Sequence, residues 1–131
     1  MEGSKVKKIR VALVDDSRVF RRAIKRFLTK EKNIAIVAEI SFVGRLLETL
    51  KRKKPDLILL DIRLRDTNSL YWVDKIKNLL PQSIIFVLTS YDYPTYRRMA
   101  EERGVPEYIL KRDVSEVLLP TIHRYFELNG D

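Results

Sequence analysis

Several residue types that build common functional sites are missing or scarce in this chain. It has no cysteine, which excludes disulfide bonds, thiolate zinc sites and a cysteine nucleophile. Its one histidine, His123, rules out a histidine-rich metal site and would have to serve any Ser-His-Asp triad. Apolar runs such as Ile84–Leu88 are far shorter than the roughly 20 residues that cross a bilayer, and Met1–Arg10 lacks the apolar stretch of a signal peptide. We therefore expect a soluble cytoplasmic protein.

Positive charge is in excess, and it is unevenly distributed. The formal net charge is +8. Residues 1–54 carry 16 Lys and Arg against 6 Asp and Glu, a net of +10, whereas residues 55–131 carry 10 against 12, a net of −2. This asymmetry is compatible with an anionic partner and equally with helices whose outer faces are solvated.

Short apolar segments alternate with longer amphipathic ones. Five segments are rich in β-branched or aromatic residues: Ile9–Val14, Ile34–Ala38, Leu57–Leu60, Ile84–Leu88 and Tyr108–Leu110. Runs that are apolar on both faces are typical of parallel strands covered by helices on both sides. Helical periodicity marks five other segments: Ser17–Lys30, Phe42–Leu50, Leu70–Leu80, Pro94–Arg103 and Ser115–Leu128. The alternation predicts a single α/β domain with a five-stranded parallel sheet.

Helix boundaries are indicated by proline, glycine and charge. The basic run Lys51–Lys54 with Pro55 is expected to end the second helix, and Gly104 to end the fourth. Pro120 lies within the last helical segment. Because proline is tolerated only in a first helical turn, this helix is expected to begin loosely, or properly only near Leu119.

Polar residues follow the predicted strands, at the edge of a parallel sheet where ligands bind. They are Asp15, Asp16, Asp61, Thr89, Ser90 and Lys111. Two carboxylates about 4 Å apart repel by roughly 4 kcal/mol at an effective dielectric constant of 20, so a cation is expected to neutralise the cluster. Oxygen ligands without nearby histidine or cysteine favour Mg²⁺. The alternative is that these aspartates only cap the following helices.

Four segments resemble the signature blocks of the response-regulator receiver domain: Val11–Ser17, Pro55–Leu64, Val87–Ser90 and Gly104–Lys111. Their order and spacing match, and the resemblance covers nearly the whole chain. It implies a flavodoxin-like, doubly wound (βα)5 fold with strand order 2-1-3-4-5. It also implies one receiver domain over residues 1–131, which acts in two-component signalling with at most self-phosphorylation and self-dephosphorylation activity.

The resemblance assigns a role to each strand-end residue. Asp61 would be the phosphoacceptor. Asp16 and Asp61 would hold Mg²⁺ by their side chains, Arg63 by its backbone carbonyl and Asp15 through water. This agrees with the chemistry, because an aspartate attacks phosphorus in line while cations offset charge on the phosphoryl oxygens.

The same resemblance assigns a switch. Thr89 would bond a phosphoryl oxygen, and Lys111 would pair with the phosphoryl charge. If Thr89 moves inward, Tyr108 is expected to turn from an exposed to a buried position. The surface of the fourth helix, fifth strand and fifth helix would then signal to a target protein or a second copy of the chain.

The expected phosphodonor is a sensor histidine kinase or a phosphotransfer protein. In receivers it docks on the first helix, because its histidine must reach the acceptor aspartate. That helix is strongly basic here, through Arg18, Arg21, Arg22, Lys25 and Arg26. An acidic rim on the donor would be steered towards this face, although a merely solvated face fits the sequence equally.

The chain departs from the usual receiver pattern in two loops. Arg65 and Ser69 stand where many receivers have proline and glycine, so the loop Arg63–Ser69 is expected to be shaped differently or to be more mobile. Arg112 follows Lys111 where a proline joined by a cis bond is usual. A cis bond to a non-proline residue costs about 3 kcal/mol, so we expect a trans bond here.

Two other classes of α/β protein are disfavoured by single residues, and further alternatives are kept. Haloacid-type hydrolases need a second aspartate where this chain has Arg63, and a flavodoxin phosphate loop would not carry Asp15 and Asp16. A basic nucleic-acid-binding module is a further alternative, although no base-reading motif or aromatic platform is evident. Within the receiver reading, the chain is either a stand-alone regulator or the receiver part of a longer DNA-binding one. DNA would be a partner only in the second case.

Overall fold

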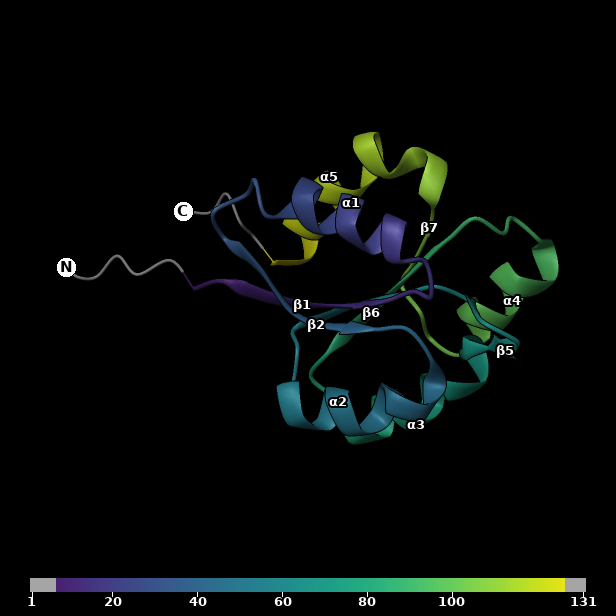
Figure 1. The fold of residues 1–131 in the computed structure, drawn as a ribbon. Coiled ribbons are helices and arrows are strands. Elements are labelled where there is room, and N and C mark those ends of the chain that lie inside the picture. The colour runs from purple at the N-terminus through teal and green to yellow at the C-terminus, as the bar shows by residue number, and fades with distance from the viewer. Residues whose placement is uncertain (1–6, 127–131) are drawn as a thin grey trace.

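A five-stranded parallel sheet forms the centre of the molecule (Figure 1). The structure is a computed structural model that describes residues 7–126. The order across the sheet is β2-β1-β3-β6-β7, which counts as 2-1-3-4-5 in sheet strands and confirms the flavodoxin-like topology. The strands are β1 (Ile9–Val14), β2 (Ile34–Ile40), β3 (Leu57–Leu60), β6 (Ile84–Thr89) and β7 (Glu107–Leu110).

Helices cover both faces of the sheet. Within the described residues they are α1 (Arg18–Leu28), α2 (Leu46–Lys53), α3 (Val73–Leu79), α4 (Pro94–Glu102) and α5 (Val114–Phe126). Figure 1 shows α1 and α5 on one face and α2 and α3 on the other. Ala100 of α4 belongs to the core on the α2 side. No helix of residues 7–126 is long and apolar enough to cross a membrane.

Successive residues of each strand enter two separate cores. In β1, Val11 and Leu13 pack towards α1 and α5, whereas Ala12 and Val14 pack towards α2 and α3. All four side chains are at most 3% exposed. The strands therefore read as continuous apolar runs, as expected for a sheet covered on both faces.

The ends of α1 and α4 follow from single residues. The hydroxyl of Ser17 accepts the Phe20 N–H at 3.1 Å and caps the first turn of α1. Pro94 opens α4, where its missing N–H costs nothing. Gly104, with a φ of +78°, takes the left-handed conformation just after that helix.

Two helix boundaries differ from the sequence prediction. α2 continues through Lys51–Lys53 and ends at Lys54, whose φ of 48° is left-handed. These cations end up in the last turn, where the helix dipole favours them. A 3-10 turn (Val43–Arg45) precedes α2, so the helix also starts later than expected.

The prediction for the last helix was wrong at its start. α5 begins at Val114, and Pro120 lies inside it on the exposed side. The buried face of Val114, Leu118 and Ile122 stabilises the helix against the sheet, and this outweighs the one backbone hydrogen bond that proline removes. Residues 127 and 128 of the expected helix lie outside the described residues.

A small hairpin stands in the loop after β3. It pairs β4 (Arg63–Leu64) with β5 (Thr67–Asn68), and a 3-10 turn (Ser69–Trp72) leads from it into α3. Neither of these short strands was predicted from the apolar pattern of the chain. The hairpin lies at the carboxyl edge of the sheet, next to the residues predicted to form the site.

Candidate functional site

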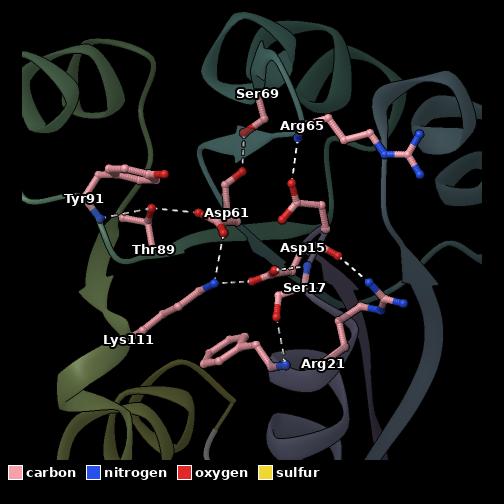
Figure 2. Close-up of polar contacts among 11 residues, drawn as sticks. Asp15, Ser17, Arg21, Asp61, Arg65, Ser69, Thr89, Tyr91 and Lys111 are labelled. Atoms are coloured by element: carbon pink, nitrogen blue, oxygen red, sulfur yellow. Dashed lines mark hydrogen bonds and ion pairs between the residues drawn. The ribbon is translucent and has the colours of Figure 1, made fainter.

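The residues predicted at the strand ends meet at the carboxyl edge of the sheet (Figure 2). Asp15 follows β1 and Asp61 follows β3, while Thr89 ends β6. Lys111 follows β7, and its Nζ lies 2.7 Å from Asp15 Oδ2 and 3.0 Å from Asp61 Oδ2. The hydroxyl of Thr89 donates to Asp61 Oδ1 at 2.7 Å. We call this cluster of Asp15, Asp61, Thr89 and Lys111 the acidic corner. Its two carboxyl groups are buried, with Asp15 4% and Asp61 5% exposed.

Burial and the contacts among Asp15, Asp61 and Lys111 together set the pKa values at this site. The pKa of Asp15 is raised, because burial disfavours its charged form and the nearby Asp61 adds to the effect, against hydrogen bonds from Lys111 and the Ser17 N–H. Burial alone would lower the pKa of Lys111, but its hydrogen bond to Asp15 and the charge of Asp61 raise it overall. Lys111 therefore stays protonated at neutral pH, and a single cation faces two acidic side chains.

Asp16 and Arg63 line the same edge but are not drawn into this corner. Asp16 is exposed, and its Oδ2 accepts the backbone N–H of Arg65 at 2.7 Å. Arg63 begins β4 with its side chain exposed. Within residues 7–126, no three acidic or imidazole side chains are close enough to form a metal cage by themselves. A metal here would have to keep water ligands, which is the usual habit of Mg²⁺.

The hairpin ties the loop after β3 to the acidic corner. Ser69 is fully buried, and its Oγ donates to the backbone carbonyl of Asp61 at 2.5 Å. Arg65 stands at the turn with a φ of 58°, a conformation closed to proline. Its guanidinium lies 4.8 Å from the centre of the Phe42 ring. These contacts give the loop Arg63–Ser69 a defined hairpin shape.

Two residues of α1 support the corner and were not singled out for this role from the sequence. Phe20 places its ring 4.1 Å from the Nζ of Lys111. Arg21 donates to the backbone carbonyl of Asp15 at 2.6 Å and pairs with Glu39 of β2 at 3.1 Å. Helical periodicity assigned Phe20 to the apolar face and Arg21 to the polar face of α1. It carries no signal that both residues reach the strand ends.

Tyr108, the predicted switch residue, is held between the exposed and the fully buried position. It is half-buried, and its hydroxyl donates to the backbone carbonyl of Tyr91 at 2.5 Å. The guanidinium of Arg97 lies 4.5 Å from its ring centre and is itself held by Asp92 at 2.7 Å. Burial raises the pKa of Tyr108 to about 12, with Arg97 opposing and Asp92 supporting the shift. These contacts explain why the ring is held against the protein.

The basic residues of α1 differ in whether a neighbouring carboxylate neutralises their charge. Arg18, Arg22 and Arg26 are exposed. Lys25 is exposed as well, but its Nζ lies 3.5 Å from Glu39, which also binds Arg21. The freely presented charge on this helix is therefore smaller than the sequence indicated.

His123 lies away from the acidic corner. It stands on α5, where its Nε2 is 3.5 Å from a carboxylate oxygen of Glu31. A Ser-His-Asp triad is therefore not formed with the strand-end aspartates. No cis peptide bond occurs in the described part of the chain, so Lys111 and Arg112 are joined by a trans bond, as predicted.

This arrangement defines a doubly wound α/β protein with a carboxylate site at its strand ends, faced by a lysine and a threonine hydroxyl. The chain belongs to the response regulator receiver domain family, which it matches over residues 11–123. The resemblance seen in the sequence is thereby confirmed. The chain is a receiver domain of a two-component response regulator.

Relatives and solved structures agree with this assignment. The chain is 34% identical over 118 residues to the sensory transduction protein LytT of Bacillus anthracis, and 33% identical over 119 residues to the response regulator protein VraR of Staphylococcus saprophyticus. These matches cover 89% and 86% of this chain but 47% and 56% of the relatives, so the chain spans about half of their length. The response regulator domain of CheB from Thermotoga maritima has a similar fold, with a TM-score of 0.80, 22% identity, and coverage of 95% of this chain and 99% of that one.

Proposed function

We propose that this domain accepts a phosphoryl group on Asp61 from a sensor histidine kinase or a phosphotransfer protein. The observation that carries the proposal is the environment of this carboxylate at the edge of the sheet. Both of its oxygens accept hydrogen bonds, one from the hydroxyl of Thr89 and one from the ammonium of Lys111. These two donors stand where an incoming phosphoryl group would need positive charge and hydrogen bonds.

In the proposed step, a carboxylate oxygen of Asp61 attacks phosphorus in line. The P–N bond of the donor phosphohistidine breaks, its electron pair stays on the imidazole nitrogen, and that nitrogen takes up a proton from solvent. Thr89 and Lys111 release Asp61 and donate to phosphoryl oxygens instead. Because Asp61 and Thr89 are buried, the new interactions form with little competition from water.

Mg²⁺ fits the donor set of this site. All candidate ligands are oxygen atoms, and a single cation, Lys111, faces the two buried acidic side chains. Asp16 and Asp61 would hold the ion by their side chains, Arg63 by its backbone carbonyl and Asp15 through water. When bound, the ion supplies positive charge next to the acceptor and the phosphoryl oxygens.

The signal would be read on the surface formed by α4, β7 and α5. Tyr91 and Tyr108 support this proposal, because the backbone that follows Thr89 is the backbone that Tyr108 binds. The partner would be a target protein or a second copy of the chain. We propose a single receiver domain in the cytoplasm, either acting alone or joined to a DNA-binding output domain as part of a longer regulator.

Labelling with acetyl phosphate tests the acceptor. Wild-type protein with Mg²⁺ should form an acid-stable, base-labile acyl phosphate, and Asp61→Asn should form none, because an amide is not a nucleophile for phosphorus. Asp66→Asn, an exposed aspartate in the hairpin turn, is the matched control and should be labelled like wild type. Equal labelling of the Asp61→Asn variant would contradict the assignment.

A further inference from the structure

A cavity of about 340 Å³ lies between the edge strand β2 and the neighbouring side of α2. This volume is within the range of small-ligand sites, about 300 to 1,000 Å³. None of the residues that line it belongs to the acidic corner. Those that matter for recognition are Ser41, Phe42, Arg45, Thr49, Arg52 and Lys53.

The cavity has more positive charge than its own carboxylate can balance. Arg45, Arg52 and Lys53 line it, and within residues 7–126 no salt bridge involves any of these three side chains. Glu39 also lines it, but its two oxygens are already bound by Arg21 at 3.1 Å and Lys25 at 3.5 Å. The carboxylate of Glu39 is therefore already compensated by two cations outside the lining, and Arg45, Arg52 and Lys53 remain to attract an anion.

The number of these cations indicates the charge of the anion. Arg45 ends the 3-10 turn before α2 and Arg52 lies in the last turn of α2, so the two stand seven positions apart along the same side of the cavity. A single phosphate group carries about two negative charges at neutral pH, whereas a chain of phosphates carries enough charge to pair with Arg45, Arg52 and Lys53 together. The hydroxyls of Ser41 and Thr49 add neutral donors, and arginine forks match phosphate oxygens.

We propose that this cavity binds a linear polyphosphate chain, either free or as the tail of a nucleotide. Phe42 lies in the cavity wall, in the loop that leads to Arg45, and the guanidinium of Arg65 lies over its ring at 4.8 Å. A base carried by a nucleotide would meet this aromatic ring. The proposal does not depend on phosphotransfer to Asp61.

Amide chemical shifts of the whole protein, titrated with sodium tripolyphosphate in EDTA at constant ionic strength, test the proposal. EDTA removes divalent ions, so that the acidic corner repels the anion. We expect saturable shifts, with one site per chain, confined to Ser41–Arg45 and Thr49–Lys53. Orthophosphate should bind at least tenfold more weakly, because it carries fewer charges to pair with the three cations.

The double variant Arg45→Gln/Arg52→Gln should lose at least tenfold in affinity for tripolyphosphate. The matched control, Lys30→Gln/Lys32→Gln, removes the same charge from exposed residues outside the cavity and should bind like wild type. Shifts that never saturate, shifts centred elsewhere, or equal losses in both double variants would overturn the proposal.

A titration with adenosine triphosphate distinguishes a free polyphosphate from the phosphate tail of a nucleotide. If adenosine triphosphate binds more tightly than tripolyphosphate, and if Phe42→Ala abolishes this difference in affinity, the ligand is a nucleotide. Equal affinity of the two probes identifies the free chain. The amide spectrum of each variant shows in the same experiment that it is folded.

Discussion

Asp15, Asp61 and Lys111 leave a charge imbalance at the sheet edge that another cation would relieve. The raised pKa of Asp15 is the thermodynamic sign of this imbalance, because burial and the neighbouring Asp61 make its ionised form costly. A carboxylate that is costly to ionise when folded makes the fold less stable as the pH rises. A bound cation would remove part of that cost.

Mg²⁺ is therefore expected to stabilise the domain even without phosphate. At a hundredfold excess over its dissociation constant, the gain in the free energy of unfolding is about 2.7 kcal/mol. Asp16→Ala should lose most of this increment, and Asp66→Ala, which removes an exposed aspartate of the hairpin turn, should keep it. Thermal unfolding in millimolar MgCl₂ and in EDTA measures the effect. An identical melting temperature in both buffers for the wild type would count against a metal site.

Tyr108 gives the fold a distinct dependence on alkaline pH. Its pKa is raised from 10.0 to about 12, so the folded protein keeps the phenol proton in a range where the unfolded chain loses it. The stabilisation is fully present below pH 10 and is lost as the pH rises towards 12. The difference in unfolding free energy between wild type and Tyr108→Phe should therefore shrink over this range.

Chemical denaturation of wild type and Tyr108→Phe at a series of pH values measures this difference. Subtracting the variant removes the titration of the other tyrosines and of the lysines. A difference that stays constant up to pH 12 would show that Tyr108 ionises as easily in the folded protein as in the unfolded chain.

At the scale of elements, the sequence predicted those parts whose determinants are local. The five strands of the sheet were found from their apolar runs, and Ser17, Pro94 and Gly104 mark helix ends through their own backbone chemistry. Pro120 misled the prediction, because its local propensity carries no information on the buried face that holds α5 on the sheet. The packing energy of a helix is a sum over many residues, so it cannot be predicted from the helix propensity of one of them.

The acidic corner could be predicted from the sequence, but its supports could not. Strand ends in a parallel sheet are bound to meet, so the order of the apolar runs was enough to place Asp15, Asp61 and Lys111 together. The hairpin depends on contacts between distant segments, such as the Arg65 N–H with Asp16, a pair 49 residues apart. A pairing of this kind leaves no periodic signal in the chain.

The loop from β6 to α4 joins the acceptor to the proposed signalling surface. Thr89 binds Asp61 on one side, and two residues later the carbonyl of Tyr91 accepts the hydroxyl of Tyr108. Thr89→Ala should leave labelling of Asp61 with acetyl phosphate possible but weaken the response of α4 and β7, because the hydroxyl that would follow the phosphoryl oxygen is gone.

Amide shifts with and without beryllofluoride measure this response. In wild type, beryllofluoride should change the shifts around Tyr91 and Tyr108, and in Thr89→Ala those changes should fall to less than half. Thr95→Ala, an exposed threonine of α4, is the control and should respond like wild type. Unchanged shifts around Tyr108 in the wild type would mean that the site and this surface are not coupled.

At the scale of the whole molecule, the excess of positive charge lies in residues 1–54, which include α1, the helix on which we propose that a phosphodonor docks. Arg18 and Arg22 are exposed in the first half of α1, which begins three residues after Asp15, whereas Lys25 is partly neutralised by Glu39. Two exposed charges contribute little to folding stability but can accelerate the encounter with an acidic partner. Arg18, Arg22 and Lys25 stay the proposed docking residues, and the first two offer the sharper test because Lys25 has a contact with Glu39.

Arg18→Glu/Arg22→Glu should slow phosphotransfer from the cognate kinase about tenfold at low salt, because steering by charge raises association rates by roughly 10- to 1,000-fold. The loss should fade towards 1 M salt, where the Debye length falls to about 3 Å. Acetyl phosphate labelling should stay unchanged, since that small donor needs no docking surface. Lys30→Glu/Lys32→Glu alters the net charge equally at exposed positions beyond the end of α1 and should transfer at the wild-type rate. If both double variants slow transfer equally across the salt series, net charge governs the encounter and the α1 face has no docking role of its own.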